Sequence, residues 1–325
     1  MKINDDLPAW ADIESQHNWH TLLLGNGASI ALWKKFTYNS LYQVADLSTD
    51  DHAIFDTLET KDFEQVLRTI QLSRLLCQQL NHSPDAEERY ESIRIALLNA
   101  VHSVHLPWES IPNTTLRKIA KTLLTYKRVF STNYDLILYW AVMSMNAAGF
   151  KDLFWSGDST CFDPENVEIY NSSKSTAIYY LHGGIHLVEQ TNGLAFKRTA
   201  DGQSLLSSFA SADQGSPLFV SEGSSEKKLR SIRSSDYLWH CYNKLKNDSR
   251  PLVIFGSALG PQDSHIAKAI SKKTDRPIAI SIFPTKRKDV IKTKIWFKEL
   301  FEDNSKVSFF DSRTHPLGDP SLSVD

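Results

Sequence analysis

The sequence contains few of the features that mark secreted, membrane or zinc-binding proteins. Its three cysteines, Cys77, Cys161 and Cys241, form no Cys-x-x-Cys pair, which suits a reducing compartment and supplies no cysteine-based zinc site. No apolar run approaches the roughly 20 residues that span a bilayer. The N-terminal stretch MKINDDLPAW is acidic and has no apolar signal core. We therefore expect a cytoplasmic protein with no membrane association.

A large excess of one charge is also absent. Lysine and arginine total 36 against 38 aspartates and glutamates, a formal net charge of -2, so no general nucleic-acid binding is expected. The basic segment TKRKDVIKTK, residues 285–294, is expected to be the solvated face of a helix. Apolar residues make up 41% of the 325 residues, enough to bury a sizeable core.

Short β-branched and aromatic runs alternate with helical stretches along most of the chain. This pattern predicts an α/β fold with a Rossmann-like, mainly parallel sheet flanked by helices. The expected strands are 21–25, 128–132, 152–155, 177–183, 217–223, 251–257, 277–283 and 306–310. The polar segment 184–216, which contains glycine and serine, is expected to form loops.

The interval 41–126 interrupts the alternation because it contains no convincing strand. Apolar residues at helical spacing predict a helix over 62–80, with Asp62 and Gln65 as a capping pair. Two further helices are expected near 90–104 and 116–124. We therefore predict a helical insertion module at 41–126 within a core formed by 1–40 and 127–325.

Polar residues with chemical potential follow several of the expected strands. In an open parallel sheet the carboxyl ends of the strands border one crevice, in which ligands bind. Five strand ends therefore indicate a single site. They carry Gly25, Asn26, Gly27 and Ser29 after the first; Thr132, Asn133 and Asp135 after the second; His182, Gly183 and Gly184; Ser221, Glu222 and Gly223; and Gly256 and Ser257 with Asp263 and His265.

Each of these signals also has a structural interpretation. The Gly25-Asn26-Gly27 turn is either a tight turn or a phosphate site at a helix N-terminus, and Ile30 stands where a dinucleotide fingerprint has its third glycine. One of Asn133 and Asp135 is suited to cap the helix that follows. We expect no metal between His182 and His186, because two intervening glycines disfavour the helix that would bring both onto one face.

The ordered motifs of the chain resemble those of sirtuins, more closely those of bacterial sirtuin-like proteins without the zinc module. The matching segments are GNGAS (25–29), STNYD (131–135), YLHGG (180–184) and FGSALGPQDSHI (255–266), with KDFEQVL (61–67) and 219–245 similar to the bacterial branch. True sirtuins carry four zinc-binding cysteines and a segment after the first turn that this chain lacks. The resemblance therefore implies an NAD-hydrolysing effector of antiphage defence in place of a protein deacylase.

That resemblance implies NAD as substrate, with no metal, and cleavage at the nicotinamide ribose. The nicotinamide leaves neutral, so the protein must stabilise an oxocarbenium-like ribose and place water near its anomeric carbon. Asn133 would orient ribose and water, and His182 would accept a proton from a ribose hydroxyl or the water. Asp135 would contact the nicotinamide amide. The expected NAD-binding residues are Gly25, Asn26, Gly27, Ala28 and Ser29 at the phosphates, and Gly256 and Ser257 at the adenosine end. Thr132, Asp135 and Asp263 complete the expected NAD-binding set.

Three other functions remain open from the sequence. They are a non-catalytic sensor of NAD or ADP-ribose, an ADP-ribosyl transferase, and the structural subunit of a defence complex with the helical module as its interaction surface. An NAD hydrolase would need a gate to spare its host, so we expect a homo-oligomer, an activating partner protein or a small-molecule signal.

Overall fold

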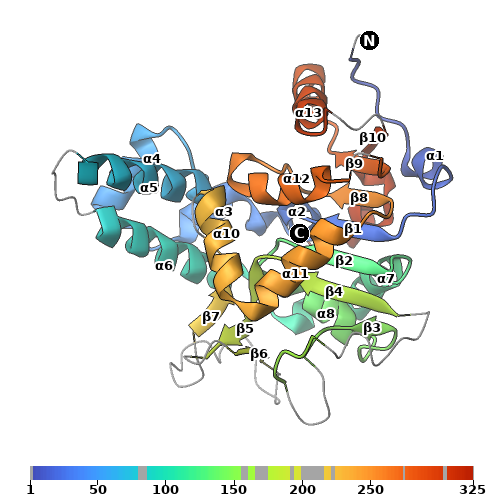
Figure 1. Cartoon of the computed structure of the whole chain (residues 1–325), viewed down its shortest axis with the longest axis horizontal. Coiled ribbons are helices and arrows are strands. Elements are labelled where there is room, and N and C mark those ends of the chain that lie inside the picture. Colours follow the sequence, from blue (N-terminus) through green and yellow to red (C-terminus); the bar gives the residue numbers. More distant parts are fainter. Residues whose placement is uncertain are drawn as a thin grey trace.

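The computed structural model describes residues 3–79, 86–154, 160–164, 175–190, 194–198, 216–220, 224–273, 275–302 and 306–324. Seven strands form its central sheet: β1 (Thr21–Leu24), β2 (Arg128–Ser131), β3 (Phe150–Lys151), β4 (Thr176–Tyr180), β8 (Leu252–Phe255), β9 (Ile278–Ile282) and β10 (Val307–Asp311). Their order is β10-β9-β8-β1-β2-β4-β3, and every neighbouring pair is parallel (Figure 1). The expected Rossmann-like parallel sheet is confirmed.

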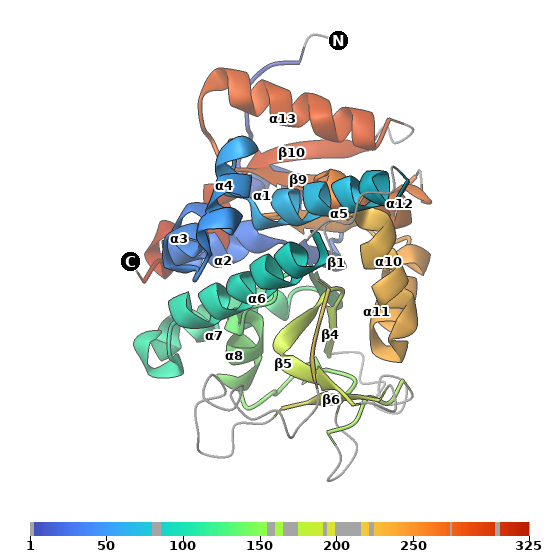
Figure 2. The same ribbon diagram turned by 90° about the vertical axis from the view of Figure 1, so that its left-hand side faces the viewer.

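Helices cover both faces of this sheet. Figure 2 shows α11 (Asp236–Asn247) and α12 (Ser264–Ser271) on one side and α7 (Asn113–Leu123) and α8 (Ile137–Met143) on the other. All four residues of β1 and all four of β8 are buried. Strands covered on both faces need continuous apolar runs, which is why these two read as unbroken hydrophobic stretches. Among the described residues outside the β1–β2 interval, two further long helices are α10 (Ser225–Ser234) and α13 (Arg287–Leu300).

The interval between β1 and β2 is helical throughout its described part. After α2 (Asn26–Leu32) it contains α3 (Tyr38–Val44), α4 (Thr49–Thr57), α5 (Phe63–Gln79), α6 (Ala86–Val104) and α7. The carboxylate of Asp62 accepts hydrogen bonds from the backbone N–H groups of Glu64 at 2.9 Å and Gln65 at 3.2 Å, so Asp62 caps α5 as expected. The backbone N–H of Asp62 donates to Thr60 Oγ1, so the expected reciprocal bond to the Gln65 side chain is not formed. The division of the chain into a core and an insertion module stays a prediction.

A second, smaller sheet was not expected from the sequence. Its strands are β5 (Gly183–Glu189), β6 (Ala195–Lys197) and β7 (Ser216–Phe219), antiparallel in the order β6-β5-β7. The expectation of loops is therefore wrong at 184–189 and 195–197, and the strand expected at 217–223 lies outside the parallel sheet. Residues 191–193, 199–215 and 221–223, including Glu222, lie outside the described residues.

Local pattern missed this sheet because its pairing joins distant segments. Gly183 has φ +75°, a left-handed conformation that turns the chain out of the main sheet and directly into β5. The segment 177–183 was interpreted as a single strand, whereas it contains the end of β4 and the start of β5. The strand expected at 152–155 is also displaced: β3 ends at Lys151, and Leu153 and Phe154 form a turn.

The basic segment 285–294 lies on α13 as expected. Lys286, Arg287, Lys288 and Lys292 are exposed, whereas Lys294 is buried and donates to the carbonyl oxygen of Asp6 at 2.5 Å. In the described part of the chain, none of the helices combines the length and apolar character that crossing a bilayer requires.

Candidate functional site

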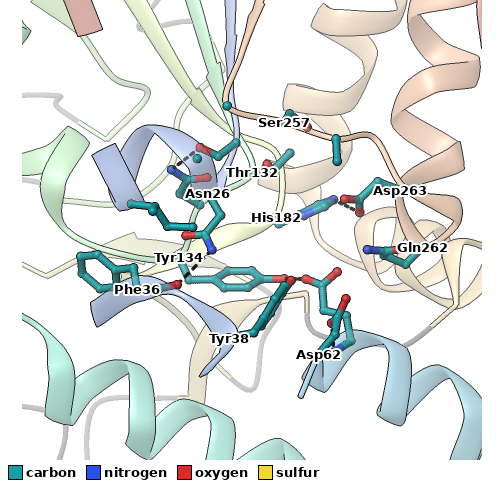
Figure 3. A pocket seen from close by; sticks show the side chains of 18 of the residues that line it. Asn26, Phe36, Tyr38, Asp62, Thr132, Tyr134, His182, Ser257, Gln262 and Asp263 are labelled. Atoms are coloured by element: carbon teal, nitrogen blue, oxygen red, sulfur yellow. Dashed lines mark hydrogen bonds and ion pairs between the residues drawn. The ribbon is translucent and has the colours of Figure 1, made fainter. Parts of the chain in front are cut away.

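A cavity of about 320 Å3 lies beside the turns that follow β1, β2, β4 and β8 (Figure 3). The chain leaves β1 for β2 on one side and later returns to β8 on the other, so β1 and β8 border a topological switch point. Ligands of open α/β sheets bind at such points. The lining includes ten expected site residues: Gly25, Asn26, Gly27, Thr132, Asn133, Asp135, His182, Gly256, Ser257 and Asp263. Ala28 and Ser29 do not line it.

Two glycine turns pack directly against each other at the centre of the site. The N–H of Gly27 donates to the carbonyl oxygen of Gly256 at 2.7 Å, and that of Ala28 donates to Gly25 at 2.9 Å. A Cβ atom on Gly25 would lie 2.6 Å from the Cα of Ser257. These glycines therefore permit the close approach of two backbones, and two amides that we expected at a phosphate already have partners. The phosphate role of the turn stays a prediction.

Replacing Gly256 by alanine is expected to lower the free energy of unfolding by about 1–3 kcal/mol. Its φ of +67° disfavours side chains, and a Cβ would lie 2.4 Å from the backbone nitrogen of Ala28. Gly260→Ala is the control, because Gly260 has φ -61° and the added Cβ would meet only the flexible side chain of Gln262. Chemical denaturation of both variants measures the difference. Equal stabilities would contradict the packing explanation.

Asn133 is anchored by its amide nitrogen. Its Nδ2 donates to the carbonyl oxygen of Gly25 at 3.1 Å and to Ser29 Oγ at 2.9 Å. Because a carbonyl oxygen can only accept, these partners also fix which end of the side chain is nitrogen. The opposite atom, Oδ1, is buried and has no hydrogen-bond partner among the described residues. Such an unpaired acceptor is destabilising, and it calls for an explanation beyond folding.

Ser29 and Asp135 hold Asn133 in place through a chain of hydrogen bonds. Ser29 Oγ donates to Asp135 Oδ2 at 2.5 Å, and Asp135 Oδ1 accepts from the N–H of Ile137 at 2.9 Å, which caps α8. Both carboxylate oxygens are therefore occupied within the protein. Thr132 is similarly tied to β1, since its hydroxyl donates to the carbonyl oxygen of Leu24 at 3.2 Å. Of the two residues expected to cap this helix, Asp135 accepts its first N–H, from one position before the N-cap residue Leu136.

His182 lies between β4 and β5 and is only 1% exposed. Its Nε2 is 3.1 Å from Nε2 of His265 and 3.9 Å from Oδ1 of Asp263. Burial, followed by the positive charge of Lys228, lowers the pKa of His182 well below its ordinary value. The imidazole is therefore neutral at pH 7. Nδ1, the other ring nitrogen, makes no hydrogen bond to the described residues, and His182 lines the cavity.

A buried ion triad, which sequence reasoning missed, forms one end of the site. Lys228 on α10 is 0% exposed, and its Nζ lies 3.2 Å from Glu64 Oε2 and 3.0 Å from Asp263 Oδ1. Burial alone would lower the pKa of Lys228, but the two carboxylates outweigh it and raise the pKa above its ordinary value. Burial raises the pKa of Glu64 despite the lysine. Asp263 has a lowered pKa because Lys228 and the two histidines outweigh its burial.

His182, Asp263 and His265 also form a cluster of the kind that can hold a metal ion. One potential ligand atom from each lies within 4.8 Å of the others. The Lys228 ammonium, however, already contacts the Asp263 oxygen that would have to join the set. A divalent cation would therefore share this carboxylate with a buried positive charge.

Several lining residues come from the helical interval and were not expected at the site. Tyr38, Asp62 and Glu64 line the cavity from α3 and the start of α5. Figure 3 shows Tyr38 and Asp62 beside Tyr134, whose hydroxyl donates to the carbonyl oxygen of Val220 at 2.7 Å. Asp62 was interpreted only as a helix cap. The available signal was the motif KDFEQVL, whose two acidic residues stand at the start of an otherwise apolar helix face.

Comparisons with known proteins give a family and distant structural likenesses. A model of the family described as "Domain of unknown function (DUF4917)" matches residues 22–317. No curated protein matches the chain. Two similar solved structures are titled "Structure of Sir2Tm bound to a propionylated peptide", with 9% identity, 94% of this chain and 92% of that chain covered, and "Structural Basis for the Mechanism and Regulation of Sir2 Enzymes", with 12% identity and coverages of 96% and 94%. Both have a TM-score of 0.36, and at this distance they carry no information about what this chain binds.

Proposed function

The chain belongs to the DUF4917 family, and we propose that its cavity binds NAD and cleaves the bond between nicotinamide and ribose. The observation that carries this proposal is a property that Asn133 and His182 share. Each is anchored through one polar atom, and each has a second polar atom, Oδ1 or Nδ1, without a partner among the described residues. Two such groups beside one cavity at a sheet switch point suit the positioning of a sugar and a water molecule.

The charge of the cavity favours a cationic transition state. Asp62, Glu64 and Asp263 line it, and the Lys228 ammonium contacts two of these three carboxylates, Glu64 and Asp263. Glycosidic cleavage passes through an oxocarbenium-like sugar, so positive charge moves from the nicotinamide ring to the ribose, and carboxylates beside the ribose stabilise this transition state more than bound NAD. The nicotinamide ring is positive in NAD and leaves neutral, so the reaction needs no acid at the leaving group.

We assign the remaining roles by position. Asn133 orients the ribose and the attacking water, and His182 hydrogen-bonds a ribose hydroxyl or that water. Gly25, Asn26 and Gly27 allow the close approach of the pyrophosphate, and Gly256 and Ser257 contact the adenosine end. The side chains of Ala28, Ser29 and Asp135 act on the ligand through Asn133 and the turn, because they lie behind the cavity wall or are already paired.

Purified wild type incubated with NAD is expected to release nicotinamide and ADP-ribose. Asn133→Ala and His182→Ala should each lower the rate on the order of a hundredfold or more, because each removes a group that positions the reacting atoms. The exposed His17→Ala serves as the control and should leave the rate unchanged. Product separation by chromatography is the measurement. Equal turnover in either variant would remove that residue from the mechanism.

We also propose that this activity depletes NAD during antiphage defence and is gated by oligomerisation or an activating partner protein. An ungated hydrolase would consume the NAD of its host. The expected result is a fall in cellular NAD on phage infection of cells that express wild type, and none with Asn133→Ala. If NAD binds in calorimetry but is not consumed under either condition, the chain is a sensor or a structural subunit. A mass increase of a target by one ADP-ribose would identify a transferase.

A further inference from the structure

A row of buried side chains extends from His182 away from the cavity. His265 on α12 and Ser225 on α10 are 2% and 6% exposed. Nε2 of His265 is 3.1 Å from Nε2 of His182, and Nδ1 of His265 is 3.1 Å from Ser225 Oγ. The backbone N–H of His265 also donates to Ser225 Oγ, at 2.8 Å. Three residues from separate elements are therefore linked by hydrogen bonds whose directions depend on one another.

The hydroxyl of Ser225 determines which atoms donate and which accept along this row of hydrogen bonds. Its oxygen already accepts the backbone N–H of His265, and among the described residues its own proton has one acceptor, Nδ1 of His265. If Nδ1 instead carried a proton, the buried hydroxyl proton would be left unpaired, which is unfavourable. Nδ1 of His265 is therefore the acceptor. A neutral imidazole carries a single proton, so His265 carries it on Nε2.

Both rings are neutral at pH 7, since burial lowers the pKa of His265 to about 4 and that of His182 well below its ordinary value. Between two neutral rings, one nitrogen must donate and the other accept. With the proton on Nε2 of His265, Nε2 of His182 accepts, and the remaining proton of His182 is on Nδ1.

We propose that Ser225 and His265 are positioning residues that fix the tautomer of His182, so that its Nδ1 presents an N–H to the ligand. The ligand atom that it recognises is then an oxygen acceptor. Under the proposed function, on which this step rests, that atom is the oxygen of a ribose hydroxyl or of a phosphate. The sequence led us to expect that His182 accepts a substrate proton. Acceptance at Nδ1 would require the hydrogen bonds of the row to reverse and would leave the Ser225 proton without an acceptor.

A metal ion between the two histidines is the rival arrangement. The ring centroids are 5.2 Å apart and the Nε2 atoms 3.1 Å apart, so the rings point at each other almost end to end, as in a direct N–H···N hydrogen bond. A shared metal would instead require both Nε2 lone pairs to converge on a third point. The ammonium of Lys228 beside Asp263 also opposes a cation there.

Nitrogen-15 NMR of the full chain labelled at histidine tests the proposal without any substrate. His182→Gln and His265→Gln assign the two ring signals. The expected result at pH 7.5 is a proton on Nδ1 of His182 and on Nε2 of His265. A proton on Nε2 of His182 would overturn the proposal. Protons on both Nδ1 atoms, with signals that move after EDTA treatment, would establish the metal arrangement and overturn it as well.

Ser225→Ala provides a second measurement. Loss of the hydroxyl removes the preference for an unprotonated Nδ1 in His265, so the minor tautomer of His182 should increase at least severalfold in the same spectra. An unchanged tautomer ratio would contradict the role of Ser225. These spectra do not depend on turnover, so a failure of the tautomer assignment and a failure of NAD cleavage are distinguishable.

If NAD is cleaved, substitution of His265 separates positioning from packing. His265→Gln retains an N–H that can donate to Nε2 of His182, whereas His265→Phe fills similar space without a donor. We expect kcat to fall on the order of tenfold or more in the phenylalanine variant, with substantial recovery in the glutamine variant. Equal rates in the two variants would contradict a role through the tautomer of His182.

Discussion

Replacing Lys228 by alanine is expected to lower the free energy of unfolding by about 3–5 kcal/mol. The substitution leaves Glu64 and Asp263 as buried carboxylates without the ammonium that both contact. Two like charges then lie close together on the wall of the cavity, where their side chains are only 12% and 16% exposed, and their desolvation is no longer compensated. Urea denaturation monitored by circular dichroism measures the loss.

Two further variants separate the ion triad from simple loss of a side chain. Lys268→Ala removes an exposed lysine from α12 and should change stability by no more than about 0.5 kcal/mol. Adding Glu64→Gln to Lys228→Ala removes one of the two uncompensated carboxylate charges and should restore more than about 1 kcal/mol of the free energy of unfolding. If the double variant is less stable than Lys228→Ala, repulsion between the carboxylates is not the cause.

Lowering the pH from 8 to 5 is expected to destabilise the protein by up to about 6 kcal/mol through three buried histidines. Burial lowers the pKa of His186 and His315 to about 3 and that of His265 to about 4. Their ordinary pKa is about 6.5, so below that pH the unfolded chain binds protons that the folded chain excludes. Stability is therefore fully present above about pH 6.5 and is lost as the pH falls toward the folded pKa values, by about 2 kcal/mol per histidine at pH 5.

His186→Phe tests this pH dependence most directly. Both ring nitrogens of His186 are buried without a partner among the described residues, and the ring stacks on Tyr139 with centroids 5.1 Å apart, a contact that phenylalanine preserves. The variant should lose about 2 kcal/mol of the destabilisation between pH 8 and pH 5. His17→Phe, at an exposed position, is the control. Burial raises the pKa of Asp62 and of Glu64, which opposes the trend because these carboxyls bind protons more readily in the folded state. An unchanged pH profile in His186→Phe would contradict the assignment.

The ion triad also connects the helical interval to the sheet. Glu64 belongs to α5, whereas Lys228 and Asp263 come from segments on the other side of β1 in the sheet order. The same interval contributes Tyr38 and Asp62 to the cavity wall. The proposed insertion module therefore completes the site. Any partner that displaced it would open the cavity and separate the buried Lys228 ammonium from Glu64. This is a physical basis for the proposed gate.

The sequence by itself determined the parallel sheet, most of its strands, the helical interval and ten of the residues that line the cavity. These follow from local patterns: apolar runs as in β1 and β8 form strands buried on both faces, and the stripe of Phe63, Val66, Leu67 and Ile70 forms one buried helix face. Polar residues at the carboxyl ends of parallel strands then converge because the strands share one direction.

Only the tertiary structure decided how the residues at those ends are used. The glycines of the first turn pack against Gly256, and both carboxylate oxygens of Asp135 accept hydrogen bonds from within the protein. The strands β5 to β7 form a separate sheet. The decisive polar contacts join residues 164 positions apart for Lys228 with Glu64 and 83 apart for His265 with His182. A local pattern carries no signal for such pairs, because their free energy depends on burial and partners that exist only after the chain has folded.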